Sequence, residues 1–197
     1  MGQRATRELI VATADDLFYR RGFDHTSFAD IATAVGISRG NFYHHFKSKD
    51  DILEAVILKR LTDRTGMTAR WERQAPDPAG RIESFIDLLL VNGEKIRQHG
   101  CPIGTLTSEL AKLAHPAQPD AVRLFTLFRE WLAGQFTALG RVETADQLAL
   151  ELLSRSQGAA TLYNAFQDRD FLEREVAAMK FWLRDIATAE TAHSPLH

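Results

Sequence analysis

The stretch from Thr26 to Lys49, TSFADIATAVGISRGNFYHHFKSK, constrains this chain most strongly, because its pattern predicts two short helices joined by a tight turn. Ser27 can cap the first helix, and Asp30, three residues later, completes a capping box. Gly36 is expected to end that helix in the left-handed conformation. Ser38 is placed to cap a second helix of about eight residues. The stretch therefore predicts a helix-turn-helix.

The second helix of this pair divides its faces. Phe42 and Phe46, four residues apart, lie on one face and are expected to anchor it. The remaining side chains are short, polar or aromatic, and a rigid exposed helix that carries such groups suits insertion into a DNA major groove. The predicted DNA-contacting residues are Thr26, Ser27, Arg39, Asn41, Tyr43, His44 and Lys49. Thr26 and Lys49 are expected to meet phosphates, and Arg39 and Asn41 to read bases. The alternative for Tyr43 and His44 is an ordinary surface or packing role.

Residues 5–60 resemble the DNA-binding end of TetR-type (tetracycline-repressor-like) regulators. The matching positions are Thr26-Ser27, Ile31-Ala32, Gly36-Ile37-Ser38, Tyr43-His44-His45-Phe46 and Lys49. Asn41 departs from the Thr, Ser or Ala that many members carry, so the operator sequence does not follow from the resemblance. The resemblance implies a three-helix DNA-binding domain, an effector domain with an inducer pocket, and pairing of the last two helices with a second subunit.

Composition and charge bound the remaining possibilities. A chain of 197 residues with 45% hydrophobic residues suits one domain or two small ones, and it has no apolar run that approaches a membrane span. The single cysteine cannot form an internal disulfide, so a reducing cytoplasm is expected. The net charge of −2 does not itself indicate nucleic-acid binding, although residues 1–49 carry seven basic side chains against five acidic ones.

The rest of the chain shows helical spacing of apolar residues and no strand-like alternation, so we predict an all-α fold. The expected further helices span residues 3–21, 48–74, 78–98, 105–113, 121–139, 144–166 and 170 onward. Asp77, a box of Thr144 with Gln147, and Asp170 with Glu173 are expected to open three of them. We predict a helix-turn-helix domain at residues 1–47 and an effector-binding and dimerisation domain at 48–197. Disorder is expected in the tail from about Ala192.

Aromatic residues are frequent in the middle helices. They either form solid core or surround an apolar cavity, and the resemblance implies the cavity. The candidate ligand-binding residues are Trp71, Phe85, Cys101, Phe125, Phe128, Trp131 and Tyr163. The last two helices supply the candidate dimer contacts, where small residues permit close approach and aromatic residues bury large areas. These are Leu152, Gly158, Thr161, Phe166, Phe181 and Trp182.

Cys101 is open to two interpretations. A lone cysteine is most often a small buried hydrophobic residue. Its Gly-Cys-Pro turn near a helix start is also a place where a thiol becomes reactive, and some TetR-type regulators sense electrophiles or oxidants through a cysteine in this region. The adjacent His44 and His45 point about 100° apart on a helix and do not converge on one ion, so no metal and no cofactor are predicted.

Together with the resemblance, the sequence predicts a ligand-responsive transcriptional repressor that binds a palindromic DNA operator as a homodimer and is released by a small-molecule inducer. The alternatives are an activator, an orphan regulator without a ligand, and a sensor of oxidants or electrophiles through Cys101. An enzyme is not expected, because the sequence shows no nucleophile–base pair, metal-ligand spacing or phosphate-binding glycine loop.

Overall fold

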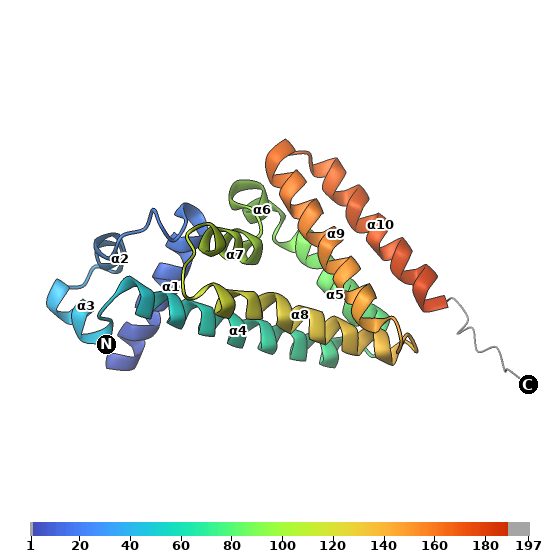
Figure 1. Ribbon diagram of the computed structural model, residues 1–197, viewed down its shortest axis with the longest axis horizontal. Helices are drawn as coiled ribbons and strands as arrows, with labels where there is room; N and C mark the ends of the chain where they lie inside the picture. The colour runs from blue at the N-terminus through green and yellow to red at the C-terminus, as the bar shows by residue number, and fades with distance from the viewer. Residues whose placement is uncertain (1, 189–197) are drawn as a thin grey trace, which may run out of the picture. The chain divides into compact units, whose positions relative to one another are not determined.

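The computed structural model of the protein describes residues 2–188, and every regular element in this range is an α-helix (Figure 1). The all-α prediction is confirmed. The predicted disorder from Ala192 to His197 lies outside the described residues. The helices are α1 (Gln3–Arg21), α2 (Phe28–Val35), α3 (Arg39–His45), α4 (Lys49–Gln74), α5 (Pro78–Val91), α6 (Gly93–His99), α7 (Pro102–Lys112), α8 (Gln118–Ala138), α9 (Ala145–Phe166) and α10 (Arg169–Thr188).

The helices form two compact units. The first contains the described residues up to Thr65 together with Pro102–Phe125, and the second contains Gly66–Cys101 together with the described residues from Thr126. The division falls within α4 and within α8. The predicted boundary after Lys47 stays a prediction, and the structure adds α7 and the first part of α8 to the N-terminal helices.

The core of the first unit draws apolar side chains from α1, α2, α3, α4 and α7. Its fully buried members include Ile10, Ile31, Phe42, Ile52 and Leu110, one from each of these helices. Burial of one such side chain contributes roughly 1.5–3 kcal/mol to folding. Because one core serves all five helices, the helix-turn-helix does not depend on its own three helices alone.

A buried ion pair ties three helices of this unit together. The side chain of Arg60 on α4 is only 4% exposed, and its Nε donates to Oδ1 of Asp15 on α1 at 2.7 Å. Its Nη1 donates to the carbonyl oxygen of Pro102, the first residue of α7, at 2.7 Å. A buried guanidinium is tolerated only when it is paired in this way. Arg60 therefore fixes the start of α7 to α1 and α4.

The second unit is built around a hairpin of α9 and α10, which lie side by side (Figure 1). α5 packs against both helices, and an ion pair joins Lys180 of α10 to Asp87 of α5 at 2.7 Å. α6 packs on α9, where the Asn164 side-chain amide donates to the carbonyl oxygens of Ile96 and Arg97 at 3.1 and 2.9 Å.

Three sequence predictions about helix ends were wrong. The single helix expected at 78–98 breaks at Asn92, whose φ of −96° and ψ of 9° depart from helical values and whose side-chain amide donates to the carbonyl oxygen of Leu88 at 3.0 Å. α7 begins at Pro102 rather than Thr105, since proline suits the first turn of a helix. α8 likewise begins at Gln118, three residues before the expected start.

The predicted helix caps had mixed outcomes. Asp77 caps α5 as expected, accepting the N–H of Gly80 at 2.9 Å. Thr144 makes no side-chain cap to α9, so the box predicted there is wrong. α10 is capped by Asp168, which accepts the N–H of Phe171 at 2.9 Å, and not by Asp170.

Candidate DNA-binding site

The turn between α2 and α3 has the local structure that the sequence predicts. The Ser27 hydroxyl accepts the Asp30 N–H at 3.0 Å, and the Asp30 carboxylate accepts the Ser27 N–H at 2.8 Å, which completes the capping box. Gly36 ends α2 at φ +74°, a left-handed conformation that glycine adopts without strain. Ser38 caps α3 by accepting the N–H of Asn41 at 3.3 Å. These contacts set the angle at which α3 leaves the turn.

α3 is held from one side by aromatic packing. Phe42 is fully buried, and Phe46 is 3% exposed. The ring of Phe28 on α2 packs edge-on against Phe42 at 4.5 Å and also contacts Tyr43 at 4.9 Å. The Arg7 guanidinium of α1 lies 4.8 Å from the centre of the Phe46 ring. The helix is thus anchored along a single face.

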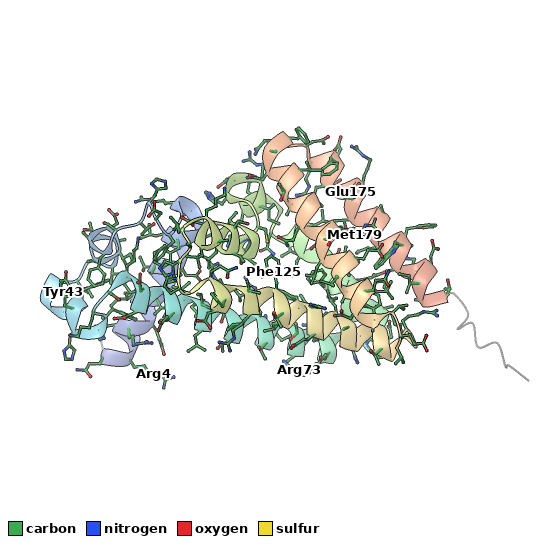
Figure 2. All side chains as sticks on the ribbon, in the orientation of Figure 1. Arg4, Tyr43, Arg73, Phe125, Glu175 and Met179 are labelled. Atoms are coloured by element: carbon green, nitrogen blue, oxygen red, sulfur yellow. The ribbon has the colours of Figure 1, made fainter. Side chains whose placement is uncertain are left out.

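The opposite face of α3 is open to solvent. Tyr43 is 50% exposed, and Asn41 and His44 are exposed beside it. Figure 2 shows Tyr43 on α3. Arg39 is the first residue of the same helix. We call the exposed Asn41, Tyr43 and His44 the reader face, and Arg39 stays a predicted base contact. Phenol, amide and imidazole groups on a rigid helix are donors and acceptors that fit base edges and phosphates.

The predicted phosphate contact of the Thr26 side chain needs correction. Thr26 is fully buried, and its hydroxyl donates to the carbonyl oxygen of Gly22 at 2.7 Å. A side chain in this position holds the turn before α2 and does not reach a ligand. Ser27 is exposed, but its hydroxyl donates to the Asp30 carboxylate at 2.6 Å.

Lys49 is half-buried and is engaged inside the first unit. Its ammonium donates to the carbonyl oxygen of Phe23 at 2.9 Å and lies 4.0 Å from the centre of the Phe23 ring. Contact of Lys49 with a phosphate remains a prediction. Meeting a phosphate would require the ammonium to divide its N–H groups between DNA and the Phe23 carbonyl.

Two further residues support the reader face. The Lys47 ammonium donates to the carbonyl oxygen of Tyr43 at 2.7 Å and so caps the last turn of α3. The Gln3 amide lies 3.4 Å from Nε2 of His44. Lys47 has a sequence signal, because a basic residue just after a helix suits its negative end. Gln3 has none, since only the packing of α1 beside α3 brings it to His44.

Two carboxylates that cap helices of the site have perturbed titration. Hydrogen bonds from the Ser27 side chain and from the Ser27 N–H hold the pKa of Asp30 below its usual value. Bonds from the Ser48 side chain and the Lys47 N–H lower the pKa of Asp51 in the same way. The Ser48 hydroxyl accepts the Asp51 N–H at 3.0 Å and the Asp51 carboxylate accepts the Ser48 N–H at 3.1 Å, which forms a capping box at the start of α4. Both caps require ionised carboxylates.

The lowered pKa of Asp30 predicts an acid-sensitive cap. The stabilisation is fully present above 3.8, the ordinary pKa of the group, and is lost as pH falls through the lower folded-state value. We expect Asp30→Asn to reduce the pH dependence of the unfolding free energy between pH 2 and 5, as measured by urea titration. The exposed Asp63, replaced by Asn, is the control. Equal pH dependence in Asp30→Asn and the unmodified chain would show that the cap makes no contribution.

The predicted ligand-binding residues are distributed over both units. Phe85 packs on Phe128 with ring centres 5.3 Å apart, and both rings are buried. Trp71 packs on Trp131 at 5.3 Å, and the Trp131 indole N–H donates to Glu72 at 2.8 Å. These pairs belong to the second unit, as do Tyr163, which is buried on α9, and Cys101, which is half-buried before α7.

Phe125 is the last residue of the first unit on α8, whereas the other predicted ligand residues fall in the second unit. An open hollow of about 400 Å³ also lies in the first unit, at the connection between α7 and α8. Leu110, His115 and Pro119 are among its lining residues, and none of the predicted ligand residues lines it. The aromatic pairs of the second unit therefore remain the candidate effector site.

The predicted dimer residues separate by exposure. Leu152 is fully buried within its own chain, so it is not available to a partner and that prediction needs correction. Phe166 and Phe181 are 70% and 64% exposed. Gly158 and Thr161 are exposed on α9, and Trp182 is half-buried against Phe136. Phe166 and Phe181 are therefore accessible to a partner, whereas Leu152 is not.

Within residues 2–188, no three His, Cys, Asp or Glu side chains are grouped so that they could hold a metal ion. None of the helices described in that range combines the length and apolar character required to cross a membrane.

Comparison with known proteins gives two family matches. Residues 10–56 match the model of bacterial regulatory proteins of the tetR family. Residues 78–178 match the model of the C-terminal domain of LmrA/YxaF-like transcriptional regulators. The two matches thus cover both the helix-turn-helix and the helices that follow it.

Relatives and solved structures agree with these matches. An HTH-type transcriptional regulator in the lacX 3′ region of Lactococcus lactis subsp. lactis is 27% identical over 90% of this chain and 92% of its own length. The HTH-type transcriptional repressor DhaR of Mycobacterium sp. (strain GP1) is 24% identical over 88% and 90%. A TetR transcriptional regulator from Legionella pneumophila superposes with a TM-score of 0.76 at 27% identity, over 90% of this chain and 95% of its own.

Proposed function

This chain belongs to the TetR family of DNA-binding transcription regulators, and on that premise we propose that it is a repressor that binds a palindromic operator as a homodimer and leaves it when a small molecule binds. Members of the family are transcription factors and not enzymes. The observation that carries the proposal is the reader face of α3, exposed on one side and held by buried aromatic rings on the other.

We assign separate roles to the side chains of the reader face, to Arg39 and to two residues at helix starts. Tyr43 and His44 are our leading candidates for DNA contact, and Arg39 and Asn41 for reading base edges in the major groove. Ser27 and Lys49 lie at the starts of α2 and α4, where backbone N–H groups favour a phosphate. Phosphate contacts set the register of the protein on DNA, whereas base contacts determine the sequence that it prefers.

Repression is proposed because several similar proteins are named repressors, DhaR among them. Pairing of two copies through α9 and α10 is supported by the exposed Phe166 and Phe181, which a four-helix bundle would bury. Gly158 has open space around it, so a partner helix can approach closely there. A two-fold dimer presents two reader faces to two half-sites about 34–36 Å apart.

The effector is proposed to bind beside the aromatic pairs Phe85–Phe128 and Trp71–Trp131 of the second unit. Such a site would favour an apolar or aromatic small molecule. If a ligand binds more tightly to a dimer whose two reader faces do not match the half-site spacing, it lowers the affinity for the operator. DNA then lowers the affinity for the ligand by the same factor. An inducer should therefore raise the melting temperature and weaken operator binding together.

The alternatives differ in what occupies the second unit. An orphan regulator would keep the aromatic pairs as solid core, and an activator would share the DNA and dimer contacts. A sensor would act through Cys101, whose half-buried thiol lies directly before α7. Modification of Cys101 by a thiol reagent without any change in operator affinity would remove the sensor.

The reader face is tested by selection of duplexes from random DNA at a stated salt concentration. We expect the unmodified chain to recover a palindrome and Tyr43→Ala to bind the selected duplex about 5- to 150-fold more weakly, which corresponds to about 1–3 kcal/mol. Arg73→Gln, an exposed change in the second unit, is the control and should keep full affinity.

Two results would contradict the proposal. If the selection recovered no preferred duplex, the proposed recognition of an operator would be wrong. If Tyr43→Ala bound the selected duplex as tightly as the unmodified chain, the reader face would lie elsewhere.

A further inference from the structure

The turn between α1 and α2 is held by a residue far away in the chain. The carboxylate of Glu109 on α7 accepts the backbone N–H of Phe23 at 2.9 Å and that of Asp24 at 3.0 Å. The two bonds use both carboxylate oxygens. Charge-assisted bonds of this kind are about twice as strong as neutral ones. Glu109 therefore clamps the turn to α7.

Gly22 provides the space for this clamp. It has φ +88°, and a Cβ at this position would lie 2.8 Å from Oε1 of Glu109. Any other residue would be strained in its backbone and would push the carboxylate away. Gly22 thus ends α1 and, because it has no Cβ, also leaves room for the Glu109 carboxylate.

The other side of the turn is held by α4. The Phe23 carbonyl accepts the Lys49 ammonium, whose charge also lies over the Phe23 ring. That ring is 4% exposed and is packed edge-on against Phe18 and His115. Phe23 therefore receives its N–H acceptor from α7 and its carbonyl donor from the first residue of α4.

The turn leads directly into the reader. Thr26 donates its hydroxyl to the carbonyl oxygen of Gly22, and Ser27 then caps α2. A shift of Gly22–Asp24 would therefore also move Thr26 and Ser27. Because the core of α2 and α3 is close-packed, such a shift changes the pose of α3 rather than being absorbed locally.

We propose that Glu109 is a positioning residue for DNA binding, which acts through the α1–α2 turn to set the pose of the reader face. It makes α7 part of the DNA-reading unit, although the match to the N-terminal family model ends at residue 56. The proposal concerns the free protein and needs no response to a ligand.

The first test measures the amides themselves. In the full-length chain, Glu109→Ala should speed hydrogen exchange at the Phe23 and Asp24 amides, because both lose their acceptor. Glu109→Gln is the conservative variant. Its side-chain oxygen can accept one N–H, but its amide nitrogen cannot accept the other. We expect faster exchange at one of the two amides in Glu109→Gln.

The second test measures binding to a duplex selected from random DNA by the unmodified chain. At a temperature at which circular dichroism shows every variant folded, Glu109→Ala should weaken binding by about 10-fold and Glu109→Gln by less. A purely stabilising residue would leave this affinity unchanged. Glu130→Gln, an exposed change on α8, is the matched control.

A double-mutant cycle of Glu109 and Gly22 separates the loss of the Glu109 contacts from the steric conflict that a Cβ at position 22 would cause. Gly22→Ala should weaken binding more in the unmodified chain than in Glu109→Ala, since the steric conflict with the carboxylate is absent there. Unchanged affinity of Glu109→Ala, or unchanged exchange at Phe23 and Asp24, would overturn the proposal. If no duplex is selected, the proposed operator recognition fails, while the exchange experiment still shows whether Glu109 holds the turn.

Discussion

Replacing Phe42 with alanine is expected to lower the free energy of unfolding of the first unit by about 3–5 kcal/mol. Phe42 is fully buried, and its ring lies 4.5 Å from that of Phe28. Removal of the ring leaves a cavity at the point where α3 is anchored, so the reader face loses its support. DNA affinity should fall together with stability.

The three tryptophans allow this effect to be assigned to one unit. Trp71, Trp131 and Trp182 all lie in the second unit, so their fluorescence follows that unit during urea unfolding, while circular dichroism follows both. In Phe42→Ala, the dichroism should change at lower urea than the fluorescence. Asn41→Ala, an exposed neighbour on α3, is the control for stability. Coincident transitions at an unchanged midpoint would show that Phe42 does not carry the stability of this unit.

Replacing Phe181 with aspartate is expected to separate the proposed dimer. Buried aromatic anchors in protein interfaces contribute about 2–4 kcal/mol, so the dissociation constant should rise by roughly 30- to 1,000-fold. An introduced charge adds a desolvation cost. Since Phe181 is 64% exposed in the single chain, the substitution should leave each chain folded. Sedimentation over a concentration series measures the dissociation constant.

Val142→Asp is the matched control for this experiment. Val142 is 68% exposed but lies between α8 and α9, outside the proposed interface. It should leave the dimer intact. A dimer of unchanged affinity in Phe181→Asp would place the interface elsewhere, and a monomeric unmodified chain would remove the homodimer from the proposed function.

The local structure of the helix-turn-helix was predictable because its causes are local. Ser27 with Asp30, Gly36 and Ser38 act within three or four residues, and the structure has each contact as expected. The buried Phe42 and Phe46 follow from their spacing on one helix. Helix bounds were less predictable, as at Asn92, where the side-chain amide bonds the Leu88 carbonyl and the expected helix is interrupted.

The candidate site could be predicted only in part, because exposure depends on neighbours that are distant in sequence. Thr26 carries a hydroxyl group that could bind a phosphate, yet packing buries it against the end of α1. Leu152 has an apolar side chain that could pack in an interface, yet it is fully buried within its own unit. Phe166 and Phe181 share that character and remain exposed.

The sequence by itself determined the all-α class, the two helices and tight turn of the helix-turn-helix, and the chemical character of the reader face, since these depend on side chains a few residues apart. Only the tertiary structure placed Glu109 against Phe23 and Asp24, across 86 and 85 intervening steps of the chain. A carboxylate on an amphipathic helix has no local signal for the amides that it will bind. Its partners are set by how α7 packs on α1, and this depends on the whole core of the first unit.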